Sequence, residues 1–105
     1  MSKMVVHHWN AAEDGQLTKE NMKAKLRKMG YSYVDYEFNP GTSFPEHTHG
    51  QEKMDCIVSG QLSFEMFGEK IILSAGDCLE VPKNVPHSAS VCGNERVVFM
   101  DATRK

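Results

Sequence analysis

From Tyr31 onwards, apolar and polar residues follow a period of two. In residues 31–38, YSYVDYEF, Val34, Tyr36 and Phe38 alternate with Tyr33, Asp35 and Glu37, as on a half-buried β-strand. Seven further segments bounded by turn residues have strand-like composition: 43–49, 53–59, 61–67, 70–73, 78–81, 87–91 and 95–101. Short strands separated by turns at this spacing predict an all-β sandwich or barrel over residues 31–101.

A helical period precedes these strands. It rests on three apolar positions at i, i+4 and i+7: Met22, Leu26 and Met29. Thr18 is a suitable N-cap and Gly30 a suitable stop, so the pattern predicts one short α-helix over residues 18–29 within an N-terminal segment 1–30. The opposite face of this helix is rich in lysine and arginine, which is typical of a solvated face.

Two adjacent histidines lie in the segment 4–9, MVVHHW, which predicts a short strand. Neighbouring side chains on a strand point to opposite faces. His7 and His8 therefore cannot bind one ion together, and we expect one of them to be exposed and the other packed.

Size and composition place the chain among soluble globular proteins. Its 105 residues predict one domain, 1–105, with 40% hydrophobic and 25% charged residues. A net charge of −2 gives no electrostatic footprint for nucleic acid. We find no apolar stretch long enough for a signal peptide or a membrane span, so a cytoplasmic protein is expected. Three cysteines, an odd number, favour reduced thiols over a disulfide framework.

Three histidines form the strongest chemical signal. His47 and His49 stand at i and i+2 in GTSFPEHTH, so on a strand their imidazoles project from one face. His87 follows about forty residues later in VPKNVPHSAS. Three imidazole nitrogens are a donor set that divalent transition metals prefer, and they leave positions open for water or substrate. The pattern predicts a metal centre at His47, His49 and His87.

Residues 33–101 resemble the cupin family. The resemblance rests on two groups of markers, namely Gly41, His47, His49 and Gly60, and then Gly76, Asp77, Pro82 and His87. It implies a cupin-like double-stranded β-barrel (jelly roll) that binds a divalent metal, commonly iron, manganese, nickel, zinc or copper, and that often forms a homodimer. It implies no single reaction, because a fold of this kind hosts many functions.

The sequence departs from the family pattern at the fourth ligand. Cupins usually supply a glutamate six residues before the second glycine, and here that position is Lys53. An ammonium offers no lone pair and repels a cation. Glu52 lies one residue away, and that shift sends a strand side chain to the other face. In the second motif Asn84 replaces the usual glycine, with the same left-handed turn available to it, and Val91 replaces the usual asparagine.

Three interpretations of Lys53 are open. Lys53 attracts an anionic ligand beside a three-histidine metal centre. Alternatively, it forms an ion pair with Asp55 or Glu80 that replaces the metal in the barrel interior, since a buried charge requires a partner. In the third, it extends into solvent at the barrel mouth.

The alternation also assigns other side chains to a face. Phe44, Glu46 and Thr48 are expected to point away from the histidines, and Ala89 is expected to share the face of His87. For Cys78 the pattern does not decide between the cavity and the outer face.

Two functions from different classes are consistent with these residues. The first is a metal-dependent enzyme of dioxygenase or isomerase type that acts on a small organic anion, with Lys53 neutralising developing charge. The alternative is a non-catalytic small-molecule binding or sensing protein, with or without metal. A third possibility is an inert barrel that acts through its dimer surface. Turnover separates the first from the others.

Overall fold

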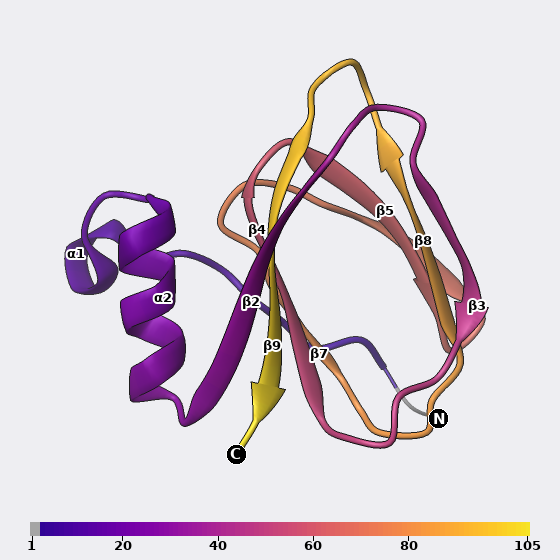
Figure 1. Ribbon diagram of the computed structural model, residues 1–105, viewed down its shortest axis with the longest axis horizontal. Helices are drawn as coiled ribbons and strands as arrows, with labels where there is room; N and C mark the ends of the chain where they lie inside the picture. Colours follow the sequence, from indigo (N-terminus) through magenta and orange to yellow (C-terminus); the bar gives the residue numbers. More distant parts are fainter. Residues whose placement is uncertain (1–2) are drawn as a thin grey trace.

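The computed structural model describes residues 3–105 and shows two antiparallel sheets with two short helices beside them (Figure 1). The elements in chain order are β1 (Val6–His7), α1 (Ala11–Asp14), α2 (Lys19–Lys28), β2 (Tyr31–Phe38), β3 (Ser43–His47), β4 (Lys53–Ser59), β5 (Gln61–Met66), β6 (Glu69–Leu73), β7 (Cys78–Val81), β8 (His87–Cys92) and β9 (Val97–Arg104). The predicted all-β fold with one short helix before it is confirmed, and α1 is an additional single turn.

The two sheets enclose one apolar core. The first sheet has the strand order β1-β7-β4-β9-β2 and the second β3-β8-β5-β6. The side chains buried between the sheets are Ile57, Leu62, Phe64, Met66, Leu73, Leu79, Val81, Val91, Val97 and Phe99. They come from alternate positions of the strands, as the period of two requires.

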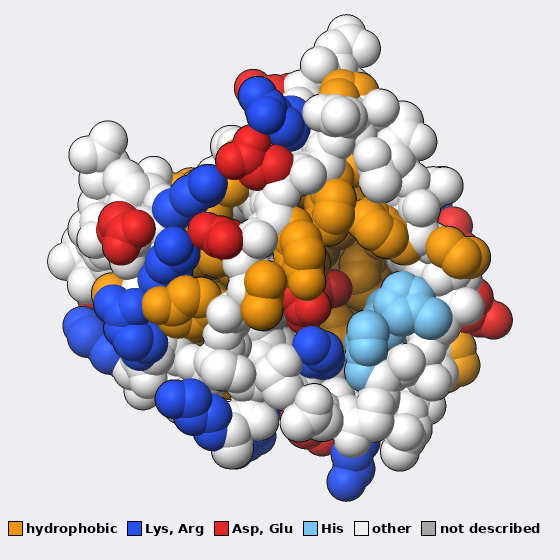
Figure 2. Space-filling view, viewed as in Figure 1, with side chains coloured by type: hydrophobic (Ala, Val, Ile, Leu, Met, Phe, Trp, Pro, Cys, Tyr) orange, Lys and Arg blue, Asp and Glu red, His pale blue; other side chains and the backbone are white. Residues whose placement is uncertain are grey.

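Helix α2 packs on the outer face of the first sheet. Thr18 caps it by accepting a hydrogen bond of 3.0 Å from the backbone N–H of Asn21. Met22 and Leu26 are buried against the sheet, whereas Met29, the third position of the predicted stripe, is 40% exposed. The helix thus covers the outside of the barrel and leaves its mouth open (Figures 1 and 2).

The two faces of β7 differ as a strand requires. Leu79 and Val81 belong to the core between the sheets, and Cys78 belongs to the separate cluster under α2. Cys78 therefore faces away from the cavity. The three cysteines are free thiols.

The short strand β1 separates the two N-terminal histidines. His7 Nε2 lies 2.6 Å from Glu80 Oε2, and His8 Nδ1 lies 2.8 Å from Asp77 Oδ1. His8 is exposed and His7 half-buried, as expected, and they have different partners. Within residues 3–105, no helix has the length and apolar character needed to cross a membrane.

Candidate metal centre and cavity

The structure brings the three predicted histidines together at the barrel mouth. His47 on β3 and His87 on β8 are direct partners in the antiparallel register, and their ring centroids lie 4.3 Å apart. The His49 ring lies 4.8 Å from the His47 ring and 5.0 Å from the His87 ring. One nitrogen from each ring lies within 4.8 Å of the others. Within residues 3–105 this is the one histidine, cysteine or carboxylate cluster with metal-binding geometry.

Two of the imidazoles are oriented by the same local hydrogen bond. His47 Nδ1 lies 2.7 Å from the carbonyl oxygen of Pro45, and His87 Nδ1 lies 2.9 Å from that of Val85. Because a carbonyl only accepts, each Nδ1 carries the proton and each Nε2 keeps its lone pair. Such an outer hydrogen bond fixes the tautomer and ring orientation of a metal-binding histidine. The donor set therefore fits a divalent transition metal.

His49 lies beyond the end of its strand. The predicted strand 43–49 ends at His47, and the His49 carbonyl accepts a hydrogen bond of 2.7 Å from the Asn84 N–H. Asn84 has φ +61°, the left-handed conformation predicted for it. Burial, the largest effect, and the nearby His47 lower the pKa of His49, and burial likewise lowers that of His87. Both rings are therefore neutral at pH 7 and able to donate a lone pair.

Lys53 is held by β9 and is not among the residues that line the cavity. Its Nζ lies 3.1 Å from Asp101 Oδ1 and donates a hydrogen bond of 2.9 Å to Thr103 Oγ1. Of the three interpretations, Lys53 thus follows the ion pair, but the partners expected from the sequence, Asp55 and Glu80, are wrong. The register places Thr103 opposite Lys53, so the neighbouring strand supplies the partner.

Glu52 does not replace the missing glutamate. It is exposed, and its carboxylate accepts a hydrogen bond of 3.2 Å from the backbone N–H of Lys83. The protein ligands brought together by the structure are therefore the three histidines.

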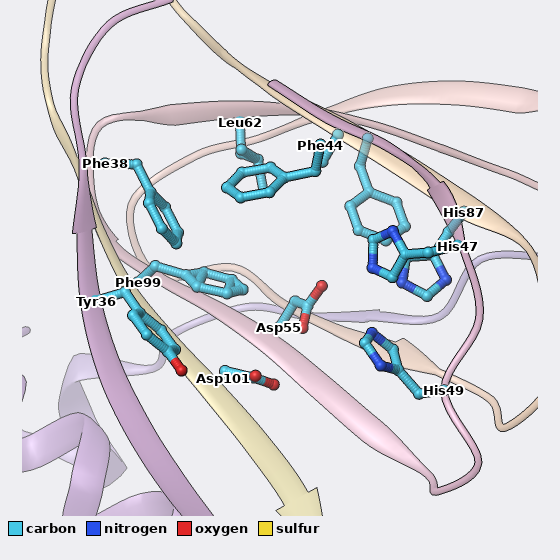
Figure 3. A pocket seen from close by; sticks show the side chains of 12 residues that line it. Tyr36, Phe38, Phe44, His47, His49, Asp55, Leu62, His87, Phe99 and Asp101 are labelled. Carbon is cyan, nitrogen blue, oxygen red and sulfur yellow. The ribbon is translucent and has the colours of Figure 1, made fainter. Parts of the chain in front are cut away.

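A cavity of about 280 Å³ opens beside the histidines (Figure 2). Its lining residues are Tyr36, Phe38, Phe44, His47, His49, Asp55, Leu62, Phe64, His87, Ala89, Phe99 and Asp101. In Figure 3 the aromatic side chains lie across the cavity from the imidazoles, and the two carboxyl groups lie between them. The cavity is thus apolar on one side and polar on the other, as small-molecule sites commonly are.

Phe44 corrects one sequence-based expectation. Strict alternation points it away from the histidines, yet it lines the cavity, with its ring centroid 4.8 Å from that of Phe38. The register of β3 and β8 shifts between Phe44 and His47. Phe44 then pairs with Ala89 and His47 with His87, so both side chains share one face. An alternating pattern cannot reveal such an irregularity.

Two aspartates complete the polar part of the cavity, and no signal in the sequence assigns Asp101 to the site. Asp55 and Asp101 are direct register partners on β4 and β9. Burial is the main cause that raises the pKa of Asp55 to about 7, with Asp101 adding to it and Lys53 opposing it. Asp55 is therefore able to gain or lose a proton near neutral pH.

Comparison with known proteins supports the fold. A family model described as "Cupin domain" matches residues 34–103. No match was found among curated proteins. KdgF from Halomonas sp. is 25% identical, with a TM-score of 0.63 over 72% of this chain and 70% of that chain. A cupin-2 domain containing protein from Shewanella frigidimarina is 21% identical, with a TM-score of 0.60 over 72% of each chain. The DMSP lyase DddQ from Ruegeria pomeroyi is 22% identical, with a TM-score of 0.64 over 72% of this chain and 39% of that chain.

Proposed function

The chain belongs to the cupin family, and on this premise we propose that it is a metal-dependent enzyme that acts on a small organic anion. The observation that carries the proposal is the convergence of His47, His49 and His87 at the edge of a cavity. A divalent ion held there would act as a Lewis acid toward a bound oxygen atom of the substrate. Iron, manganese, nickel and zinc all accept imidazole ligands, so the donor set is compatible with each.

The cavity favours a small substrate with an apolar part. Its volume of about 280 Å³ is near the lower end for small-molecule sites. The rings of Tyr36, Phe38 and Phe99 form its apolar wall (Figure 3). We infer that an anionic group of the substrate lies on the histidine side and that the apolar part packs on these rings.

Asp55 is our candidate for proton transfer. Its carboxyl group lines the cavity, and a pKa of about 7 suits a general acid or base at neutral pH. A protonated Asp55 would donate to an oxygen of the substrate, and an ionised Asp55 would accept a proton from it. In this proposal Asp55 moves the proton and the histidines bind.

For Lys53 we propose a positioning role. Its ammonium fixes Asp101 at 3.1 Å and limits the rise in the pKa of Asp55. Direct attraction of an anion by Lys53 stays a prediction from the sequence. The two roles differ in outcome, because only direct attraction makes ligand affinity depend on the charge of Lys53 when Asp101 is also neutralised.

One observation favours the non-catalytic alternative. Lys53 replaces the glutamate of the family pattern, and its ion pair with Asp101 gives the barrel a polar interior without a metal. In this alternative the same cavity binds a small molecule and no bond is broken.

The experiment that tests the proposal begins with metal content, measured by elemental mass spectrometry on protein purified without chelator. We expect near-stoichiometric metal in the wild type and its loss in His47→Ala/His49→Ala. The matched control is His8→Ala, which removes an exposed histidine outside the cluster and should leave the metal in place. Equal metal in all three proteins, or none after reconstitution, would contradict the proposed centre.

Turnover then separates the enzyme from the binding protein. Candidate carboxylic acids are screened for oxygen uptake or isomerisation with the metal found. Activity that disappears in His49→Ala supports the enzyme. Ligand binding without turnover, detected by calorimetry on the same loaded protein, supports the alternative.

A further inference from the structure

A second cluster of metal-binding atoms lies on the opposite face of the first sheet, beneath helix α2. Five of the eight buried residues in this cluster carry sulfur: Met22, Met54, Cys56, Cys78 and Met100. Asp55 lines the histidine cavity, so its neighbours in β4 point to the other side of the sheet. The sulfur cluster is therefore separate from the candidate metal centre.

Three of these sulfur atoms come together from three different elements. Cys56 on β4 and Cys78 on β7 are direct partners in the antiparallel register. Cys78 Sγ lies 3.7 Å from Met22 Sδ on α2. All three side chains are at least 97% buried. The arrangement thus places two thiols and one thioether around a point shielded from water.

Their chemistry selects a soft ion. Thiolate and thioether ligands favour Cu(I), whereas zinc takes thiolate, imidazole or carboxylate ligands. A trigonal ion with metal–sulfur bonds of about 2.3 Å has its sulfur atoms about 4 Å apart. The 3.7 Å between Cys78 Sγ and Met22 Sδ is close to this separation. We propose that Met22, Cys56 and Cys78 form a binding site for one Cu(I) ion.

Binding balances without any change of oxidation state. One Cu(I) ion replaces the protons of Cys56 and Cys78, both protons pass to solvent, and the complex of two thiolates, one thioether and the ion carries a charge of −1. Lys25 on α2 acts electrostatically on Cys56 and supplies a compensating positive charge. A coordinating thiol is deprotonated outright, so a thiol that is neutral in the free protein can still become a ligand.

Core packing and disulfide formation account for less of the sulfur cluster. Methionine commonly fills irregular gaps in cores, which accounts for Met54 and Met100. It does not account for two register-paired thiols with a thioether on a third side. A Cys56–Cys78 disulfide would require a reactive thiolate, but the hydrogen bond with Cys78 and burial raise the pKa of Cys56.

The test is a Cu(I) titration of the full chain, reduced, metal-free and without oxygen, in competition with the coloured Cu(I)–bicinchoninate complex. We expect the wild type to remove one Cu(I) per chain. Cys56→Ala/Cys78→Ala should weaken binding by more than the about 10- to 100-fold that loss of an outer-shell partner causes. X-ray absorption should find three sulfur neighbours in the wild type and two in Met22→Leu.

Two controls separate this site from other copper ligands. Cys92 is a half-buried thiol on the second sheet, and Cys92→Ala should bind Cu(I) as the wild type does. His47→Ala/His49→Ala should also retain Cu(I), even though it loses the divalent ion, so the failure of one site is distinguishable from failure of the other.

Two results would overturn the proposal. One is wild-type affinity in Cys56→Ala/Cys78→Ala, and the other is an unchanged number of sulfur neighbours in Met22→Leu. The Met22→Leu substitution nearly conserves volume, so it decides the question even if the cysteine variants do not fold.

Discussion

Asp55 and Asp101 occupy directly opposite positions on β4 and β9, and both line the cavity. Two like charges facing each other across a sheet are destabilising. The structure relieves this in two ways: Lys53 pairs with Asp101, and the raised pKa of Asp55 lets that carboxyl keep its proton. The pair thus links the stability of the barrel to the protonation state of its cavity.

The first prediction concerns this link to pH. The pKa of Asp55 is about 7 in the folded chain, against a usual value of 3.8. Its protonated form therefore stabilises the fold fully below about pH 4, and this contribution is lost as pH rises through 7. Asp55→Asn should be more stable than the wild type at pH 8, by about 1 to 3 kcal/mol. The full shift corresponds to about 4 kcal/mol at 1.4 kcal/mol per unit, reduced by solvent in the open cavity.

This prediction is checked by urea unfolding of both proteins at pH 5 and pH 8, with chelator present. Because both proteins retain the histidines, the difference between them cancels the histidine contributions. Asp35→Asn, which removes an exposed carboxylate paired with Lys23, should show no gain at pH 8. The same stability difference at both pH values would show that Asp55 does not titrate as stated.

The second prediction concerns the ion pair on β9. Lys53→Met removes the partner of Asp101 and the positive charge that lowers the pKa of Asp55. Both side chains of the pair are partly buried, so we expect a loss of about 1 to 3 kcal/mol at pH 7, between the values for exposed and buried pairs. Chemical denaturation gives the free energy of unfolding, and the metal content should not change.

A double variant isolates the pair. Lys53→Met/Asp101→Asn leaves no unpaired carboxylate at this position and should regain most of the lost stability. If it is no more stable than Lys53→Met, the ion pair is not the cause of the loss. Weaker binding of an anion by Lys53→Ala, persisting when Asp101→Asn is added, would instead support direct attraction of the ligand by Lys53.

The third prediction concerns the homodimer, which stays a prediction from the family resemblance. Val34 lies on β2, an edge strand of the first sheet, and is 53% exposed. Unpaired edge strands with exposed apolar side chains favour pairing with another chain. We expect a dimer in light scattering after size-exclusion chromatography, and Val34→Lys should convert it to monomer.

Ile72 supplies the matched control. It lies on β6, an edge strand of the second sheet, and is 50% exposed. Ile72→Lys should leave the dimer intact. Dissociation by Ile72→Lys but not by Val34→Lys would place the interface on the second sheet.

The elements could be predicted because their signals are local. The period of two indicates the strands with errors of up to three residues at their ends, and the spacing of His47, His49 and His87 indicates a shared site. The pairing of Asp55 with Asp101 has no such signal. It depends on β4 lying beside β9, and nothing in either segment specifies its neighbour. The partners predicted for Lys53 are wrong for the same reason.

The structure also depends on local irregularities that an alternating pattern cannot show. The register shift in β3 turns Phe44 into the cavity, and the early end of that strand leaves His49 on a loop held by Asn84. Cys78 could not be assigned to a face because both faces of β7 are covered, one by the core and the other by α2. The sequence therefore indicates which residues form the site better than it indicates what surrounds them.

The last prediction tests why a glycine is required at the turn between β4 and β5. Gly60 has φ +83°, and a Cβ there would lie 2.5 Å from the carbonyl oxygen of Arg96 and 3.0 Å from Val97 Cα. Gly68 has a similar φ of +73°, but a Cβ there would meet nothing within 4 Å. Gly68→Ala should therefore cost only the backbone strain of about 1 to 2 kcal/mol. Gly60→Ala adds a clash with backbone, which we expect to cost at least about 2 kcal/mol more, by analogy with overpacking in cores.

Thermal unfolding of the two variants compares these costs directly, since about 1 kcal/mol shifts the Tm of a domain this size by roughly 4 to 8 °C. Because the two glycines share the left-handed conformation, the difference between the variants reports the contact with the Arg96 and Val97 backbone alone. The Tm of Gly60→Ala should lie well below that of Gly68→Ala. Equal values for the two would mean that Gly60 is needed only for its φ, and that the segment before β9 can move away from the turn.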